Sequence, residues 1–167
     1  MEIICLYGNP DSGKTEALNM LAKKILEEME GCKIIYESNL DEKNDIDSNP
    51  EEIGNFLVSG FKSDWNLILQ WNTKKIGFTM KGDNLTEIEK GLAFIDKNRD
   101  VDIFLIAARR KGSDTYNKVE QYAKEKQDIA FTLIHQRKIQ DKKRKEDIIH
   151  KNDNQVITLY NIIIKPK

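Results

Sequence analysis

The sequence Gly8-Asn9-Pro10-Asp11-Ser12-Gly13-Lys14-Thr15 decides the fold of this chain, because it joins two segments of different periodicity. Before it, residues 3–7 read Ile-Ile-Cys-Leu-Tyr, an apolar run that is typical of a buried strand. After it, the apolar residues recur at helical spacing, at Leu18, Leu21, Ala22, Ile25 and Met29. Gly31 then supplies a stop. The pattern predicts a strand, a loop and a helix in direct succession.

The order of residues in this loop suits the binding of phosphate. Glycines let the chain coil so that backbone N–H groups point inward, and the helix turns its positive dipole end to the same cavity. Lys14 would reach the β- and γ-phosphates and act in catalysis, and the Thr15 hydroxyl would ligate Mg²⁺. Asp11 would tune the local field or orient water, or would only cap the turn or face solvent.

The pattern G-x-x-x-x-G-K-[ST], placed between an expected strand and an expected helix, resembles the Walker A loop of the P-loop NTPase superfamily. The resemblance is specific over about residues 2–30. It implies a nucleoside triphosphate ligand together with Mg²⁺, but it does not identify a reaction. All of residues 8–15 are therefore expected to contribute to the phosphate site: Gly8, Asn9, Pro10, Asp11, Ser12, Gly13, Lys14 and Thr15.

Length and composition limit the classes of protein. A chain of 167 residues is long enough for one α/β domain and too short for two ordinary ones, so we expect a single domain over residues 1–167. With 27 basic and 28 acidic residues, no overall charge directs the chain to nucleic acid or membrane. Cys5 and Cys32 lack the spacing of a metal site. No apolar run approaches a membrane span and the first strand leaves no room for a signal peptide, so we expect a cytoplasmic protein.

The remaining elements are predicted from apolar periodicity and turn signals. Strands are expected at 33–37, 65–71, 76–80, 101–107 and 129–134, with 72–75 as a four-residue hairpin loop. Helices are expected from the N-cap Asn49 to Gly60, from a capping box at Thr86, from Ser113 or Asp114, and in a C-terminal segment. The C-terminal segment carries the stripe Ile149, Val156, Tyr160 and Ile163, with 152–154 as a candidate break, and 39–49 is expected to be a long mobile loop.

This alternation predicts a single-domain, three-layer α/β fold of the P-loop NTPase type, with a mainly parallel sheet and one antiparallel hairpin strand. Ligands of such sheets bind beyond the carboxyl ends of the strands. The residues at those positions are therefore the candidates for the site: Gly82, Asp83, Ala108, Arg109, Arg110, His135 and Gln136.

Asp83 is the expected carboxylate for Mg²⁺. The order hairpin, carboxylate, helix is similar to small GTPases, in which the second hairpin strand lies beside the first strand and ends in an Asp-x-x-Gly switch. Here the sequence is Lys81-Gly82-Asp83-Asn84, which departs from that switch. A helix-capping turn is the alternative explanation for Asp83.

Arg109 is the expected catalytic cation, because a guanidinium beside the γ-phosphate would stabilise transferred charge. With Arg110 and Lys111 it would otherwise form a solvated turn. His135 would contact a base or move a proton, although a structural role is the more common one for a single histidine.

The base and the macromolecular partners are less strongly indicated. Guanine recognition usually needs Asn-Lys-x-Asp directly after a strand, whereas Asn117-Lys118-Val119-Glu120 falls inside an expected helix, so ATP is preferred over GTP. The basic stretch 137–145 is interrupted by Asp141 and has no aromatic residues for base stacking, so a solvated helix start is favoured over nucleic-acid binding.

Three functions fit these expectations. The first is a slow, Mg²⁺-dependent ATP hydrolase with nucleotide-responsive loops at 39–49 or Gly82. The second is a small-molecule or nucleotide kinase, with an unknown second substrate and residues 109–112 as the sole candidate lid. The third is a non-enzymatic, nucleotide-gated binding module that acts through an unknown protein partner.

Overall fold

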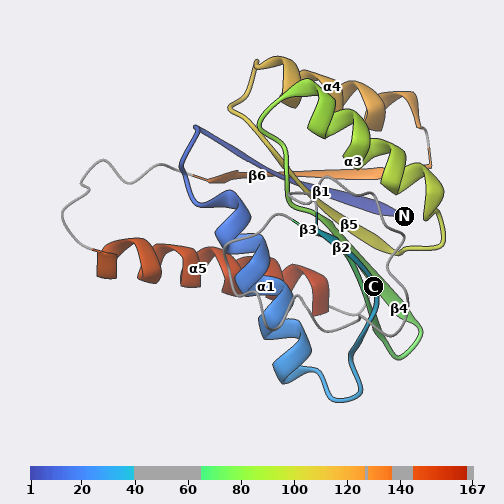
Figure 1. Cartoon of the computed structure of the whole chain (residues 1–167), viewed down its shortest axis with the longest axis vertical. Helices are drawn as coiled ribbons and strands as arrows, with labels where there is room; N and C mark the ends of the chain where they lie inside the picture. The colour runs from blue at the N-terminus through green and yellow to red at the C-terminus, as the bar shows by residue number, and fades with distance from the viewer. Residues whose placement is uncertain (40–64, 127, 137–144, 165–167) are drawn as a thin grey trace.

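The computed structural model describes residues 1–39, 65–126, 128–136 and 145–164, and it describes the side chains of the last segment from residue 153 onward. Four helices and six strands lie within these residues (Figure 1). In chain order they are β1 (Glu2–Gly8), α1 (Lys14–Glu28), β2 (Lys33–Asn39), β3 (Trp65–Trp71), β4 (Lys74–Thr79), α3 (Leu85–Lys97), β5 (Ile103–Ala108), α4 (Asp114–Glu125), β6 (Ala130–Gln136) and α5 (Lys145–Ile164).

The six strands form one mixed sheet in the order β2-β3-β4-β5-β1-β6. The pairs β4–β5, β5–β1 and β1–β6 are parallel, whereas β3 is antiparallel to both β2 and β4. One strand therefore runs against the other five, as the sequence predicts. The carboxyl ends of β4, β5 and β1 meet at the same edge of the sheet.

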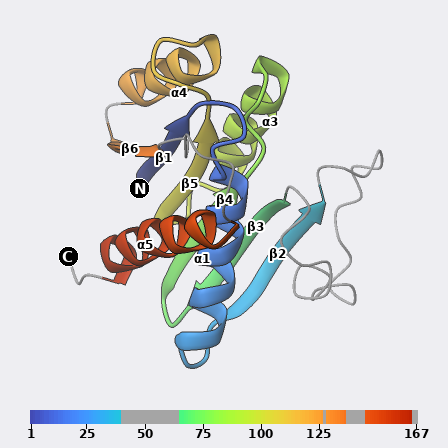
Figure 2. The same cartoon turned by 90° about the vertical axis from the view of Figure 1, so that its left-hand side faces the viewer.

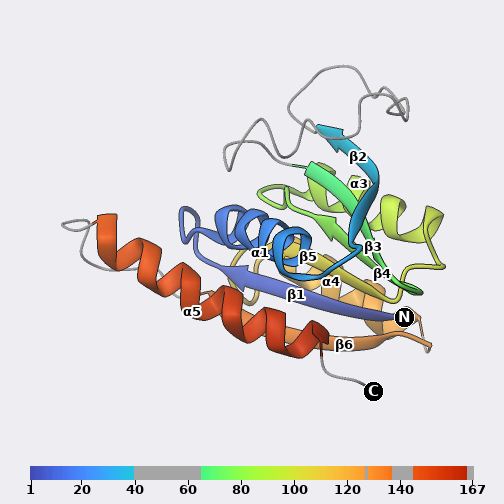
Figure 3. The same ribbon diagram turned by 90° about the horizontal axis from the view of Figure 1, so that it is seen from below.

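Helices cover both faces of this sheet (Figure 2). Along β1, Ile4 and Leu6 face the layer of α1 and α5, and Ile3 and Cys5 face the layer of α3 and α4. All four side chains are fully buried, and burial of each of the three aliphatic ones contributes about 2 kcal/mol to folding. Figure 3 shows α5 lying beside α1 across one face. The three-layer α/β architecture is thus confirmed.

The position of β4 corrects the expectation based on small GTPases. β4 pairs with β5, and β5 separates it from β1. Gly77 lies opposite Phe104 in this pairing, and a Cβ at Gly77 would come within 2.1 Å of the Phe104 ring. The Phe104 ring therefore occupies the space that a side chain at position 77 would need. Glycine at this position allows β4 and β5 to pair.

Several predicted boundaries also change. The hairpin turn consists of two residues, Asn72 and Thr73, because Asn72 adopts a left-handed conformation (φ 54°) that closes the turn early. Residues 74 and 75 consequently belong to β4. The capping box of α3 begins at Asn84 and not at Thr86, since the Asn84 side chain accepts a hydrogen bond from the Glu87 N–H.

At the C-terminal end, β6 extends through Gln136, so that His135 and Gln136 lie within the strand and not after it. α5 runs without a break through residues 152–154. The expected helix from Asn49 to Gly60, the segment 40–49 and the basic stretch 137–144 lie outside the described residues. No helix within the described residues is both long enough and apolar enough to cross a membrane.

Candidate functional site

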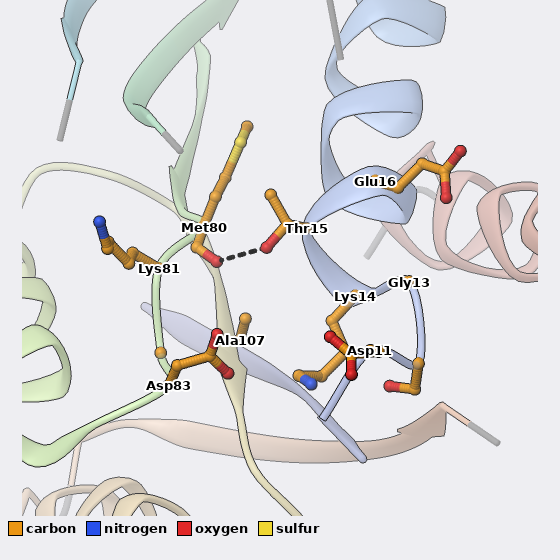
Figure 4. Close-up of a pocket in the computed structure, with 11 residues that line it drawn as sticks. Asp11, Gly13, Lys14, Thr15, Glu16, Met80, Lys81, Asp83 and Ala107 are labelled. Carbon is orange, nitrogen blue, oxygen red and sulfur yellow. Dashed lines mark hydrogen bonds between the residues drawn. The ribbon is translucent and has the colours of Figure 1, made fainter. Parts of the chain in front are cut away.

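A pocket of about 350 Å³ opens at the carboxyl edge of β1, β4 and β5. Figure 4 shows Lys14 and Thr15 of α1 on one side of it and Met80, Lys81 and Asp83 on the other. Its complete lining is Asp11, Ser12, Gly13, Lys14, Thr15, Glu16, Met80, Lys81, Gly82, Asp83 and Ala107. Residues from the expected phosphate loop and the expected metal carboxylate are therefore brought together, although about 70 residues separate them in the sequence.

The backbone of the loop leaves the start of α1 open to a ligand. Gly13 is the N-cap residue, with φ 82°, a left-handed conformation that glycine adopts without strain. It provides no side-chain hydrogen bond to the first turn of the helix. The Ser12 hydroxyl is buried and has no hydrogen-bond partner among the described residues. Uncapped amides and a buried hydroxyl fit the oxygens of a bound phosphate.

Lys14 is a buried cation in this pocket. The residue is 7 % exposed, and its Nζ donates a hydrogen bond to the Asn9 carbonyl oxygen at 3.0 Å. Burial lowers the pKa of Lys14 below its ordinary value, and the nearby Asp83 carboxylate raises that pKa again in part, while Arg109 lowers it. Burial raises the pKa of the Cys5 thiol to about 12, so that at neutral pH the thiol gives Lys14 no counter-charge. An anion in the pocket would relieve this cost.

Thr15 links α1 to the end of β4. Its hydroxyl donates to the Met80 carbonyl oxygen at 3.2 Å, directly after the strand (Figure 4). The same hydroxyl is the group expected to ligate Mg²⁺. No cluster of three His, Cys, Asp or Glu side chains occurs in the part of the chain that the structure describes. A Mg²⁺ ion here would therefore take phosphate oxygens and water beside Thr15 and Asp83, which is its usual preference.

Asp83 lies at the pocket because the chain passes close to β5. A Cβ at Gly82 would come within 1.9 Å of the Ala107 carbonyl oxygen, so that only glycine allows this approach. The Asp83 N–H donates to the Glu87 carboxylate at 2.8 Å, which fixes its backbone. The alternative, an Asp-Asn helix-capping turn, is also present, because Asn84 caps α3 directly after Asp83. The side chain that forms this cap is that of Asn84, and Asp83 takes part through its N–H.

Arg109 lies at the rim of the pocket and forms an ion pair with Asp83, with 3.8 Å between Nε and Oδ1. The Asp83 and Arg109 side chains are 65 % and 42 % exposed, so this pair contributes little to stability and can exchange partners. The Arg109 N–H donates to the Thr115 hydroxyl at 3.1 Å. Arg110 and Lys111 are exposed. Residues 109–113 form a short turn, closed by a hydrogen bond from Ser113 N–H to the Arg110 carbonyl, which leads straight into α4.

His135 does not line the pocket. Its ring stacks on Tyr7 with 5.0 Å between centroids, and its side chain is exposed at the edge of the sheet. The structure therefore favours the structural role for this histidine. Asn117 to Glu120 lie within α4, as the sequence predicts.

Sequence reasoning gave no role to Gln136, the last residue of β6. It is 1 % exposed, and its Nε2 donates to the Ser12 carbonyl oxygen of the loop at 3.2 Å. β6 pairs with β1 in a register that places Gln136 opposite Gly8. A polar residue that ends an otherwise largely apolar strand is the only signal in the sequence. Its contact with the loop depends on a pairing that the sequence does not reveal.

No protein-family model, curated protein or solved structure matches this chain. The likeness to P-loop NTPases therefore rests on the sequence motif of residues 8–15. Residues 11–15 of that motif line the pocket together with Asp83, whereas Gly8, Asn9 and Pro10 do not line it.

Proposed function

We propose that this protein binds ATP together with Mg²⁺ in the pocket at residues 11–16 and 80–83 and slowly hydrolyses the γ-phosphate. The observation that carries the proposal is the buried Lys14 at the uncapped start of α1, across the pocket from a carboxylate. A buried cation and an open helix N-terminus attract phosphate, and the carboxylate and the Thr15 hydroxyl suit the hard cation that accompanies it.

Each residue then has a definite task. Lys14 would leave the Asn9 carbonyl and bind phosphate oxygens. Thr15 would exchange its bond to the Met80 carbonyl for a place on Mg²⁺, with Asp83 on the same ion directly or through water. The metal ion would neutralise charge on the phosphates when bound. Water would attack the γ-phosphorus in line with the leaving oxygen.

Arg109 is the residue that would stabilise charge on the transferred group, because it is the arginine at the rim whose charge already acts on Lys14. In the structure it is paired with Asp83 and does not line the pocket. Engagement of Asp83 by Mg²⁺ would release it. Because the pair is exposed, this exchange of partners costs little free energy.

The preference for ATP over GTP is supported by the place of residues 117–120. They lie in α4 and not directly after a strand, where a guanine-binding segment would be expected. Residues 40–49, proposed above as nucleotide-responsive, lie outside the described residues, so that the turn at Gly82 is the described candidate for such a response.

The test is thermal unfolding of the wild type and of Lys14→Ala with ATP, GTP, ADP and a non-hydrolysable ATP analogue, each with Mg²⁺ and with EDTA. A ligand that binds only the folded state at a hundred times its dissociation constant adds about 2.7 kcal/mol to the free energy of unfolding. We expect this gain in the wild type and its loss in Lys14→Ala. Lys24→Ala is the matched control, because Lys24 lies on the same helix, paired with Glu28 far from the pocket.

Absence of any nucleotide effect in the wild type would overturn the proposal. Where binding is found, phosphate release without an acceptor identifies a hydrolase, and ADP formation that requires an acceptor identifies a kinase. Tight binding without turnover identifies a nucleotide-gated binding module. The short turn at residues 109–113 offers no lid of the kind that a kinase needs at that position.

A further inference from the structure

We infer that Gln136 is a positioning residue that sets the phosphate loop in its binding conformation by fixing the peptide group between Ser12 and Gly13. The inference rests on the proposed function, because it assigns the shape of that same site to a residue on another strand. Gln136 does not line the pocket and acts only through the loop.

The contact lies within the protein interior. Gln136 is 1 % exposed and Ser12 is 9 % exposed, and the Gln136 Nε2 donates to the Ser12 carbonyl oxygen at 3.2 Å. A buried amide donor on a backbone carbonyl is costly to remove, since the carbonyl would then lose its partner without gaining water. The Ser12 carbonyl is therefore held toward β6.

The direction of this carbonyl determines the direction of the next N–H. The peptide group is planar and trans, so that its C=O and its N–H point in opposite directions. A Ser12 carbonyl that is held toward Gln136 turns the Gly13 N–H to the opposite side, away from β6. Gly13 itself lines the pocket. The contact thus selects one of the two orientations of a peptide group that glycine would otherwise let rotate freely.

The backbone around this contact is packed too closely for the loop to shift as a unit. A Cβ at Gly8 would come within 2.3 Å of the Gln136 carbonyl oxygen and within 2.9 Å of the Ser12 hydroxyl oxygen. The first residue of the loop therefore rests on the backbone of Gln136, while the Gln136 side chain holds the middle of the loop. Both ends of one residue on β6 fix the geometry of the loop.

The experiment compares wild type, Gln136→Met and Thr132→Val by calorimetric titration with Mg²⁺–ATP and Mg²⁺–ADP, below the unfolding temperature of each. Methionine keeps the length of the side chain but has no N–H donor. Thr132→Val is the matched control, because Thr132 on the same strand donates to the Glu2 carboxylate at 3.1 Å, at the end of β6 remote from the loop. It removes one side-chain hydrogen bond that does not touch the loop.

We expect Gln136→Met to bind both nucleotides about tenfold more weakly, which is the effect of one misplaced donor to a charged oxygen. The loss should be equal for ATP and ADP and should be absent in Thr132→Val. The amide resonance of Gly13 should shift in ligand-free Gln136→Met and stay unchanged in the control. Unchanged affinity and an unchanged Gly13 resonance in Gln136→Met would overturn the inference.

A wild type that binds no nucleotide would refute the proposed function, and the Gly13 resonance would then still test the positioning role. Should Gln136→Met fail to fold, exchange of the side-chain amide protons of Gln136 with solvent in the wild type decides the matter. Slow exchange supports the contact, and exchange as fast as that of the exposed Gln121 contradicts it.

Discussion

Helices α1 and α3 begin at the same edge of the sheet, each after a strand that runs in the same direction, yet their first turns are finished in opposite ways. In α3, the Asn84 side chain accepts from the Glu87 N–H at 3.0 Å, and the Glu87 carboxylate accepts from the Asn84 N–H at 3.3 Å. α1 begins at Gly13, which gives no side-chain cap. The first turn of α3 is thus capped by its own side chains, and that of α1 has no side-chain cap.

This difference supports the proposal that the start of α1, and not that of α3, faces a ligand. A helix cap contributes about 1 kcal/mol, and α4 also has one, from Ser113. At α1 the chain gives up this stabilisation and in addition buries the Lys14 ammonium. Two unfavourable features at one place are explained when an anion supplies both the cap and the counter-charge.

The largest effect on the loop before α1 is expected from Gly8→Ala. Its Cβ would come within 2.3 Å of the Gln136 carbonyl oxygen, and backbone cannot move aside as a flexible side chain can. We expect the free energy of unfolding in urea to fall by about 3 kcal/mol and nucleotide binding to be lost.

The control for this change is Gly112→Ala, in the turn before α4. Gly112 has φ 84° and nothing within 4 Å of an added Cβ, so only backbone strain of about 1 kcal/mol is expected. Equal stability of the two variants would show that the close packing at Gly8 does not constrain the loop.

Asp83→Asn tests the metal site beside the start of α3. Asp83 directly precedes the cap of α3 and also lines the pocket. With Mg²⁺ present, ATP affinity should fall about tenfold, as is usual when a metal partner is removed. With EDTA the affinity should rise slightly, since a negative charge near the phosphates is gone. Calorimetric titration under both conditions gives the two signs.

Asp100→Asn is the matched control for Asp83→Asn. Asp100 is also an exposed carboxylate in an ion pair, with Lys75, and it does not line the pocket. It should change neither affinity. A loss of ATP affinity in Asp83→Asn that is the same with and without Mg²⁺ would remove Asp83 from the metal site.

On the α3 side, Asn84→Ala should lower the free energy of unfolding by about 1 kcal/mol and leave nucleotide affinity unchanged. Affinity is retained because the Glu87 carboxylate still holds the Asp83 N–H at 2.8 Å. Thr86→Ala should cost less, since Thr86 lies inside the helix and alanine is the better helix former there. A larger loss of unfolding free energy in urea from Thr86→Ala than from Asn84→Ala would show that Thr86 is the capping residue.

The contrast between the caps also shows what the sequence could predict. The strand, loop and helix around residues 8–15 were predictable because the apolar periodicity and the glycine positions are local properties. The cap at Asn84 was within reach, because Glu87 follows it by three residues just as Glu89 follows Thr86. The sequence contains two overlapping capping patterns, Asn84 with Glu87 and Thr86 with Glu89, and the first of them forms in the structure.

The rest depends on contacts between distant residues. The pairing of β4 with β5 is fitted by Phe104 lying over Gly77, and nothing local marks these two residues as neighbours. The role of Gln136 depends on its register opposite Gly8. The structure places Asp83 at the pocket, and the binding of Mg²⁺ by Asp83 stays a prediction.

The smallest effect is expected from removal of the Lys14 charge, which tests whether this buried ammonium destabilises the ligand-free protein. Burial lowers the pKa of Lys14 below its ordinary value of 10.5, so at neutral pH the unfolded chain holds this proton more readily than the folded protein does. Ionised Lys14 therefore destabilises the ligand-free fold, and this penalty disappears as the pH rises through the lowered pKa toward 10.5.

Lys14→Met keeps the length of the side chain without the charge. In urea unfolding at pH 7 without nucleotide, it should be more stable than the wild type by a few tenths of a kcal/mol, and the difference should shrink by pH 10. A less stable Lys14→Met at pH 7 would mean that the bond from Lys14 to Asn9 and the attraction of Asp83 outweigh burial, and that α1 carries no stored cost for a ligand to relieve.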